Sequence, residues 1–334
     1  MRAKPRLFFN RHFSTAADQM TMSEPVQSSP PRKGGSLYDA RWTRLMVFIL
    51  KRFPTSFCVY ATSPIAFIFY LFARDQGRAV RANLKALFPE WSRVGCWLGA
   101  YQVFRQFALT YLDRLLYRHC SRQVEWDVHG MEFFEQMKNE PGGVLVFTVH
   151  SGNYDVGSSL LAEKLGRPLH TVRVPERSQS LDELRMEELY AASSEQPLLR
   201  FHYNTPGGHL GIDLCRLLLA GEIVAVQGDR VVMDVSPLAV VHEGVSYTIP
   251  LGPFVLAETA CVPCYPIQVI RSGVCRYRID LAKPFFTGQS KMSRKELAGL
   301  WIPVMADILH RNWNQWFVFE HIIRRVAPPS ADGG

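Results

Sequence analysis

The sequence predicts an α/β fold, in which a mixed, partly parallel sheet is flanked by helices and follows an N-terminal membrane-associated helical segment. From residue 123 onward, apolar runs of strand length alternate with helix-like stretches. This alternation is typical of buried, largely parallel sheets. Residues 53–73 contain no charged side chain. The chain has 334 residues, 47% of them hydrophobic, which is enough apolar material for one large core or two smaller ones.

Composition divides the chain into four regions. They are a disordered basic N-terminus at 1–36, membrane-associated and amphipathic helices at 37–120, an α/β core at 121–326 and a disordered tail at 327–334. The first region is rich in Arg, Ser, Pro and Gly, as in "SSPPRKGGS", and such segments do not bury enough apolar surface to fold. Its stretch "RLFFNRHFSTAA" is basic and free of acids, as organelle transit peptides are. A true start at Met20 or Met22 is the alternative.

The uncharged stretch 53–73 predicts membrane association. It is just long enough to cross a hydrocarbon core, which needs roughly 20 residues, and Lys51 and Arg52 precede it. Pro64 and several Ser and Thr residues weaken the case for a spanning helix. The alternatives are an interfacial helix, extended by the apolar face of "WTRLMVFIL", and a pair of buried helices in a soluble domain.

Residues 78–117 are predicted to be helical, because large apolar residues recur there at three- and four-residue steps. These residues are Trp97, Tyr101, Phe104, Ala108, Tyr111 and Leu115. Basic residues precede them at Arg74, Arg78, Arg81 and Lys85. The basic residues form either a solvated face or a surface in contact with lipid headgroups.

The core region predicts alternating strands and helices. The strands are predicted at 144–149, 168–174, 198–204, 223–228, 261–270 and 275–282. Helices are predicted near 155–165, 179–193, 209–220 and 253–260. Residues 291–325 are expected to be helical as well, with an aromatic cluster at Trp313, Trp316, Phe317 and Phe319.

Charge and cysteine content narrow the partners and the compartment. The formal net charge is +8, which favours acidic partners such as anionic lipid, an acidic carrier protein or phosphorylated substrates. No nucleic-acid-binding motif is present, so nucleic acid is not an expected partner. Seven scattered cysteines make a poor disulfide framework and suggest a reducing compartment. Cys261 and Cys264 form a single C-x-x-C, which is expected to be a pair of partly buried core thiols rather than a metal or redox site.

Ionisable residues stand at the ends of three predicted strands. His150 ends the first of them and Arg173 the second, while Asp229 and Arg230 follow "IVAVQG", which ends in Gly228. Chemistry in open α/β sheets gathers where strands end and loops begin. The sequence therefore predicts a site at these strand ends, although loop residues are commonly polar without any function.

His150 and Asp155 can meet only if the histidine lies outside the following helix. Residues five apart on one helix are about 140° apart around its axis. Gly152 permits a turn, Asn153 can cap the helix, and Asp155 then falls in the first turn, where the helix dipole favours its ionised form. From there Asp155 could hold one imidazole nitrogen and leave the other as a base. About one H-x-x-x-x-[D/E] is expected by chance in this composition, so a polar turn is the alternative.

Several other chemistries lack support in the sequence. It contains no G-x-S-x-G nucleophile elbow, no Walker A motif, no G-x-G-x-x-G and no H-E-x-x-H. A metal site built on His150 and Asp155 would need a third ligand, and the sequence points to none.

Taken in order along residues 40–325, several stretches resemble the bacterial lipid A late acyltransferases of the lauroyl/myristoyl transferase type. They are "RAVRANLKALFPEWS", "VHSGNYD" with its H-x-x-x-x-D, "TVRVPE", "GEIVAVQGDRV" and "YTIPLGPFVLAETACVPCYPIQVIR". Two features depart from the best-known members of that family. Asp155 stands where they have Glu, and "GDR" replaces a more typical Asp-Gln. In both features the chain is more similar to the wider set of acyltransferases of this superfamily, which leaves the acceptor open more than the chemistry.

The resemblance implies acyl transfer from a thioester to a hydroxyl or amine of a membrane lipid, with acyl carrier protein as the expected donor and acyl-coenzyme A as the alternative. It implies an enzyme at an anionic membrane surface, the inner membrane, with its site facing the cytoplasm. No metal or bound cofactor is required. The alternatives are an acyltransferase for a glycerolipid or aminolipid, and a non-catalytic lipid-binding protein of the same fold.

The same resemblance suggests a role for each strand-end residue. His150 would take the proton of the acceptor, and Asp155 would orient His150. Backbone N–H groups near Gly152 and Asn153, or Arg173, would stabilise the oxyanion, and Arg173 could instead bind a phosphate. The segment Gly228, Asp229 and Arg230 would position the acceptor or shape the site.

Overall fold

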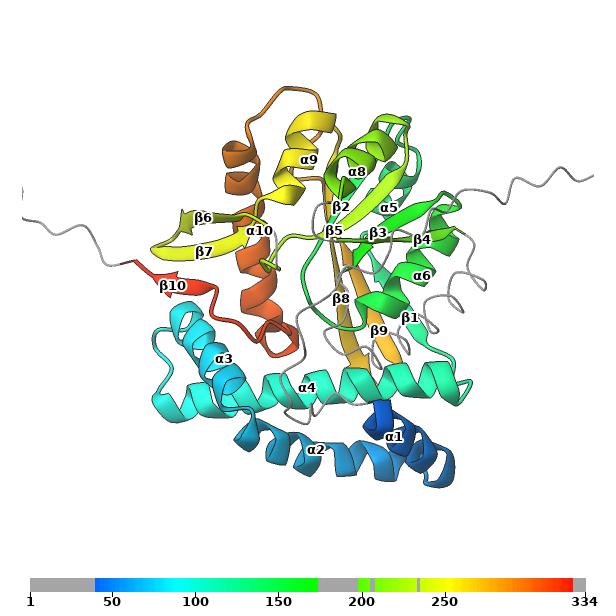
Figure 1. Cartoon of the computed structure of the whole chain (residues 1–334), viewed down its shortest axis with the longest axis vertical. Coiled ribbons are helices and arrows are strands. Elements are labelled where there is room, and N and C mark those ends of the chain that lie inside the picture. The colour runs from blue at the N-terminus through cyan, green and yellow to red at the C-terminus, as the bar shows by residue number, and fades with distance from the viewer. Residues whose placement is uncertain (1–39, 174–197, 205–207, 233–234, 327–334) are drawn as a thin grey trace, which may run out of the picture. The chain divides into compact units, whose positions relative to one another are not determined.

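The computed structural model describes residues 40–173, 198–204, 208–232 and 235–326 (Figure 1). The predicted disordered N-terminus and tail, the transit-peptide-like stretch and the helix expected at 179–193 lie outside the described residues. The described residues all belong to one compact unit. The boundary predicted at 120/121 falls between a helix and a strand, and a division into separate domains there stays a prediction.

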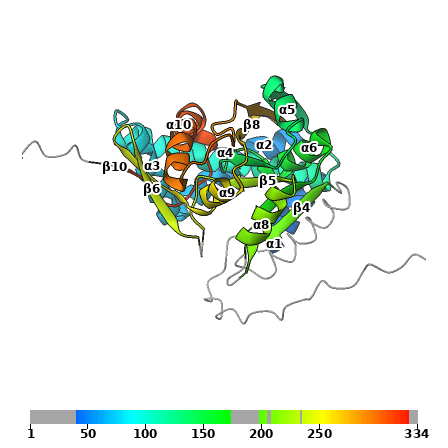
Figure 2. The same ribbon diagram turned by 90° about the horizontal axis from the view of Figure 1, so that it is seen from above.

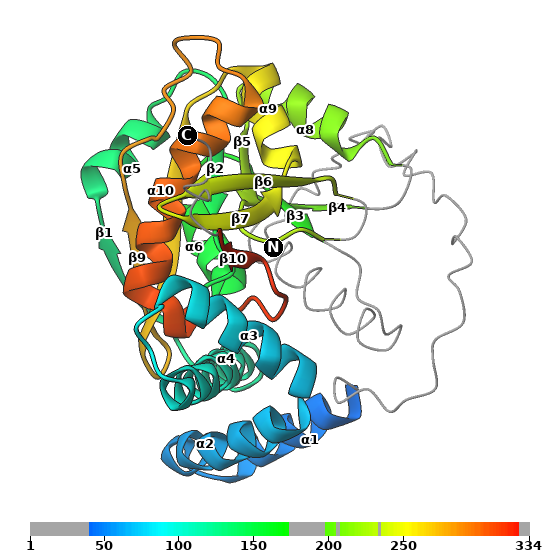
Figure 3. The same ribbon diagram turned by 90° about the vertical axis from the view of Figure 1, so that its left-hand side faces the viewer.

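Four helices precede the sheet. They are α1 (Ala40–Arg52), α2 (Thr55–Phe72), α3 (Arg74–Leu87) and α4 (Arg93–His119). Ser92 caps α4, where its hydroxyl accepts a hydrogen bond from the Gly95 N–H. Figures 1 and 3 show α1 and α2 on the far side of α4 from the sheet. One side of α2 packs on α4, and most of the rest of its surface is exposed.

Seven strands form the main sheet in the order β1-β9-β8-β2-β5-β3-β4. Their bounds are β1 Glu125–His129, β2 Val144–Thr148, β3 Leu169–Arg173, β4 Leu199–Tyr203, β5 Ile223–Gln227, β8 Cys264–Gly273 and β9 Arg276–Leu281. The β8–β9 pair is antiparallel, and the other neighbouring pairs are parallel. The predicted mixed α/β sheet is therefore confirmed, including the six strands expected from the sequence.

Helices cover both faces of this sheet. Alternate residues of β2 point to opposite faces, and each set packs against different helices. Val144 and Val146 pack with residues of α5 (Met131–Lys138) and α6 (Tyr154–Leu165). Leu145 and Phe147 pack with α8 (Leu210–Leu219), α9 (Gly252–Ala260) and α10 (Arg294–Asn312). Figure 2 shows α5 and α6 across β5 from α8 and α9. The helices predicted at 155–165, 209–220 and 253–260 correspond to α6, α8 and α9.

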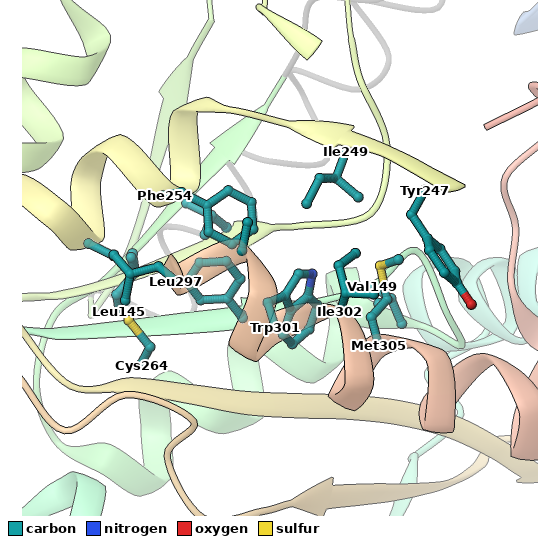
Figure 4. Close-up of a cluster of buried hydrophobic side chains, with 14 of the residues drawn as sticks. Leu145, Val149, Tyr247, Ile249, Phe254, Cys264, Leu297, Trp301, Ile302 and Met305 are labelled. Carbon is teal, nitrogen blue, oxygen red and sulfur yellow. The ribbon is translucent and has the colours of Figure 1, made fainter. Parts of the chain in front are cut away.

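Trp301 of α10 is at the centre of the larger core cluster (Figure 4). It is fully buried, its ring packs 5.1 Å from that of Phe147, and its indole N–H donates to the Gly228 carbonyl at 3.0 Å. This contact joins α10 to the end of β5. Cys264 lies in the same cluster and burial raises the pKa of its thiol, whereas Cys261 is half-buried at the end of α9.

The region 291–325 is only partly helical, so the prediction that these residues are helical is wrong beyond residue 315. A 3₁₀ turn at Trp313–Gln315 follows α10, and the chain then extends into β10 (Ile323–Arg325). β10 pairs with β7 (Val245–Pro250), which pairs with β6 (Pro237–His242) in a second, antiparallel sheet. Tertiary hydrogen bonds to the backbone override the helical pattern here. The elements β1, α5, β6, β7 and β10 were not predicted.

Asn83 of α3 holds the segment that leads into β10. Its buried Oδ1 accepts hydrogen bonds from the N–H groups of Ile322 and Ile323 at 3.1 and 3.2 Å, and its Nδ2 donates to the Glu320 carbonyl at 2.8 Å. One amide side chain thus replaces three backbone partners. The "RAVRANL" stretch therefore has a structural role at this position.

We expect Asn83→Ala to lower the free energy of unfolding by about 3 kcal/mol, since each unsatisfied buried polar group costs roughly 1–3 kcal/mol. Urea midpoints at constant m-value measure the effect. Asn312→Ala serves as the matched control with a smaller expected loss, because its Nδ2 donates a single hydrogen bond, to Gln268 Oε1 at 3.1 Å. Equal stability of Asn83→Ala and the wild type would contradict the stabilising role given to the three Asn83 hydrogen bonds.

Candidate active site

The turn between β2 and α6 carries His150. β2 ends at Thr148 and α6 begins at Tyr154, with Asn153 as its cap. Gly152 has φ +54°, and a Cβ there would lie 2.3 Å from the Val269 carbonyl oxygen, so only glycine fits this turn. The structure therefore confirms the predicted geometry, in which His150 stands outside the helix and Asp155 lies in its first turn.

Asp229 is the carboxylate that holds His150. Its Oδ1 lies 2.8 Å from the imidazole Nδ1, and its Oδ2 accepts a hydrogen bond from the His150 backbone N–H at 2.9 Å. The Trp316 indole N–H donates to the same Oδ2 at 2.9 Å. Asp229 is fully buried, which alone would raise its pKa, but the contacts with His150 and Trp316 outweigh burial and lower the pKa.

This arrangement decides the tautomer of the imidazole. An ionised carboxylate can only accept hydrogen bonds, so Nδ1 of His150 carries the hydrogen. The other nitrogen, Nε2, has no hydrogen-bond partner among the described residues. His150 is 8% exposed. Its Nε2 is therefore the ring nitrogen with a lone pair available to a substrate.

Asp155 does not hold the imidazole, and the predicted contact is wrong. Its two oxygens face two guanidinium groups instead: Arg114 of α4 at 2.9 Å and Arg173 of β3 at 2.6 Å. All three side chains are largely buried. Burial alone would raise the pKa of Asp155, but Arg173 and Arg114 together lower it. The prediction failed because it did not include the guanidinium groups of Arg114 and Arg173. Both attract the carboxylate of Asp155, away from the imidazole and towards α4 and β3.

The segment that follows α10 holds the turn between β2 and α6 through backbone contacts. The Phe317 N–H donates to the His150 carbonyl at 2.7 Å, and Ser151 forms an isolated bridge with Trp316. The Ser151 hydroxyl also donates to the Val269 carbonyl at 3.1 Å. Trp316 was seen in the sequence only as part of an aromatic cluster in an expected helix. Its role depends on the extended backbone that replaces that helix.

Gly228 and Arg230 flank Asp229 in different ways. The Gly228 N–H donates to Thr148 at 2.9 Å, and a Cβ on Gly228 would lie 2.9 Å from the Phe147 ring. Gly228 is thus a close-packing position at the end of β5. Arg230 is partly exposed, with its Nε 4.0 Å from Glu320. Substrate binding by either residue stays a prediction.

A model of the family described as bacterial lipid A biosynthesis acyltransferase matches residues 37–321. The chain belongs to this family. No curated protein matches the sequence. Among solved structures, the chain is similar to the 1-acyl-sn-glycerophosphate acyltransferase PlsC from Thermotoga maritima. That match has 11% identity and a TM-score of 0.36, and it covers 74% of this chain and 99% of that one.

Family membership makes the protein a lipid acyltransferase. The turn between β2 and α6, which carries the candidate site, is anchored through α4. Arg114 reaches Asp155, and the preceding residue, Asp113, is fully buried against β8 and β9. The Asp113 carboxylate accepts hydrogen bonds from Arg271 Nε at 2.7 Å and from the Tyr277 hydroxyl at 2.9 Å. Adjacent residues of α4 therefore fix this helix both to the sheet and to the first turn of α6.

No group of three His, Cys, Asp or Glu side chains suited to a metal occurs in the part of the acyltransferase that the structure describes. The nearest carboxylates at His150 and at Arg173 are each already engaged, by the imidazole and by two guanidinium groups. The polar groups of the site are thus arranged as hydrogen-bonded pairs and ion pairs.

Acid should lower the free energy of unfolding of the acyltransferase by protonating Asp155. A carboxyl group with a lowered folded-state pKa contributes stability that is fully present above the unfolded value, about 3.9, and is lost as pH falls through the folded value. We expect Asp155→Asn to cost about 3 kcal/mol near neutral pH, because it leaves two buried guanidinium groups without their anion.

Urea unfolding across a pH series measures this effect. The difference in free energy of unfolding between the wild type and Asp155→Asn should become smaller as the pH falls below about 4. A difference that is absent at neutral pH, or one that does not change with acid, would contradict the ion-pair account.

Proposed function

We propose that this acyltransferase moves a fatty acyl chain from a thioester on acyl carrier protein to a hydroxyl or amine of a lipid A-like membrane lipid. The observation that carries the proposal is the His150–Asp229 pair. It combines a buried carboxylate on Nδ1 with an Nε2 that has no partner among the described residues. This is the arrangement that a general base needs.

His150 acts as base and then as acid. Nε2 accepts the proton of the acceptor hydroxyl or amine as its oxygen or nitrogen attacks the thioester carbonyl. The tetrahedral intermediate collapses, the C–S bond breaks, and the departing thiolate takes the proton from the imidazolium. Asp229 stabilises the imidazolium while it exists, since its pKa is lowered by this same contact. Atoms and charge balance with no further reactant.

The start of α6 supplies donors for the oxyanion. The N–H groups of Gly152 and Asn153 lie two and three residues after His150, at the positive end of the helix. Neither N–H has a hydrogen-bond partner among the described residues. Donors held rigidly where negative charge develops are worth several kcal/mol in such reactions. The tight turn at Gly152, which lies close to the Val269 carbonyl, keeps them in place.

The Arg114–Asp155–Arg173 network binds a phosphate of the acceptor or of the donor's phosphopantetheine arm. Arg114 and Arg173 place two guanidinium groups in a largely buried place, and a guanidinium matches the geometry of a phosphate. Asp155 therefore acts as a positioning residue for Arg173 rather than for His150. Arg230, beside the same strand ends, is the further basic group available to an anionic substrate.

The enzyme acts at the inner membrane, with its site open to the cytoplasm, where acyl thioesters are made. Support comes from α2, which is the one helix among the described residues long and apolar enough to cross a membrane by length and composition. Only 17% of that segment is buried. Large apolar side chains are exposed along α1 and α2, among them Phe48, Phe57, Tyr60, Ile65 and Phe72. Such a surface suits contact with lipid.

We expect His150→Ala to lower the rate of acyl transfer by at least about 10³-fold, within the range for loss of a general base. Transfer from labelled acyl carrier protein to a lipid A precursor measures it. His129→Ala is the matched control, because His129 also pairs with an aspartate, Asp127 at 2.8 Å, but lies exposed on β1. That control should retain the wild-type rate.

The same assay tests the acceptor and the donor. A panel containing a lipid A precursor, a lysophospholipid and an aminolipid, each offered with acyl carrier protein or coenzyme A thioester, names the substrates. Turnover by His150→Ala at the wild-type rate would overturn the base assignment. Turnover on the lysophospholipid or aminolipid alone would overturn the lipid A-like acceptor and leave the base assignment intact.

A further inference from the structure

A second basic site lies away from the strand ends, where α2 meets α3. A cavity of about 200 Å³ is lined there by Tyr70, Leu71, Arg74, Arg78, Arg81 and Trp97. We call it the arginine pocket. Its residues come from α2, α3 and α4, whereas the catalytic turn lies between β2 and α6. The acyl-transfer mechanism uses none of them.

The three arginines share one face of α3. Residues at spacings of four and three lie above one another on a helix, which places Arg74, Arg78 and Arg81 in one row. Among the described residues, the row has one carboxylate partner, Asp75, which lies 2.6 Å from Arg78. The row therefore carries a net charge of +2. Like charges held this close favour the binding of an anion.

The walls of the arginine pocket are held in position. Arg81 Nη1 donates to the Tyr70 hydroxyl at 2.9 Å, and its guanidinium lies 6.0 Å from the centre of the Tyr70 ring. The Tyr70 hydroxyl in turn donates to the Trp97 carbonyl at 3.2 Å. Tyr70 is buried, and its ring packs against that of Trp97 at 5.3 Å. A pre-ordered guanidinium loses less freedom when it binds an oxyanion.

An exposed apolar surface begins at the edge of the pocket. On the last turns of α2, Ile68, Leu71 and Phe72 are 55%, 48% and 75% exposed. Guanidinium groups beside such a surface match the chemistry of a phospholipid, whose phosphate binds arginine bidentately while its acyl chains cover apolar side chains. Soluble phosphate would not account for the apolar side chains.

We propose that the arginine pocket binds the phosphate of an anionic membrane phospholipid, whose acyl chains lie against the exposed end of α2. This lipid is bound in addition to the acceptor at His150 and is not acylated. It fixes how the enzyme sits on the membrane. The proposal goes beyond the proposed function and does not depend on which lipid is acylated.

The test compares two double variants that remove the same charge. Arg74→Gln with Arg78→Gln empties the arginine pocket of two cations. Arg216→Gln with Arg294→Gln is the matched control, since these exposed or half-exposed arginines lie on α8 and at the start of α10. Each of them pairs with a carboxylate, as Arg78 does. Figures 1 and 3 show these elements on the opposite side of the sheet region from α2. Equal melting temperatures confirm that both variants fold.

Binding of the full chain to vesicles is measured by co-sedimentation at constant ionic strength. The vesicles contain phosphatidylcholine alone or phosphatidylcholine with phosphatidylglycerol. Each arginine near an anionic surface contributes about 1 kcal/mol, so the pocket variant should lose about 30-fold in affinity for the mixed vesicles. The control should stay within about twofold of wild type. Binding to phosphatidylcholine alone should be equal for all three, because it depends on the apolar surface.

Three results would overturn the proposal. One is equal affinity of the pocket variant and the wild type for the mixed vesicles. Another is an equal loss in the control, which would indicate net charge rather than a site. The third is saturable binding of inorganic phosphate without vesicles that disappears in the pocket variant, which would assign the pocket to a soluble anion. Because no readout involves acyl transfer, failure here leaves the proposed function untouched.

Discussion

The buried carboxylate of Asp229 accepts three hydrogen bonds, and each one fixes a different part of the structure. The His150 backbone N–H fixes the end of β2, the imidazole Nδ1–H fixes the ring, and the Trp316 indole N–H fixes the segment after α10. A fully buried carboxylate without such donors would be strongly destabilising. This one side chain therefore connects the ends of β2 and β5, the imidazole of His150 and the segment that follows α10.

A second layer of buried charge holds the surroundings of that centre. Asp113 and Arg114, adjacent on α4, bind the sheet and the first turn of α6 respectively. Asn83 on α3 binds the backbone that leads into β10. The N-terminal helices thus contact both the first turn of α6 and the segment that leads into β10. The family match, which covers residues 37–321, includes these helices.

Much of the sheet, and the strand ends at which the candidate site lies, could be predicted from the sequence, because apolar runs of strand length define strands and parallel strands bring their ends together. His150, Arg173 and Asp229 were found in this way. The partner of His150 could not be predicted. Asp155 and Asp229 both fall at the same edge, and only packing decides which one faces the imidazole. Arg114 was missed because its helix is remote in sequence, and Trp316 because a helical pattern continued past the true end of α10.

The protonation of His150 tests the central claim most directly. NMR of isotopically labelled histidine, with His150→Ala to assign the signal, reports which ring nitrogen carries the hydrogen in the neutral imidazole. We predict hydrogen on Nδ1 in the wild type and in Asp155→Asn, and loss of that preference in Asp229→Asn. Hydrogen on Nε2 in the wild type, or a preference lost in Asp155→Asn but kept in Asp229→Asn, would contradict the account.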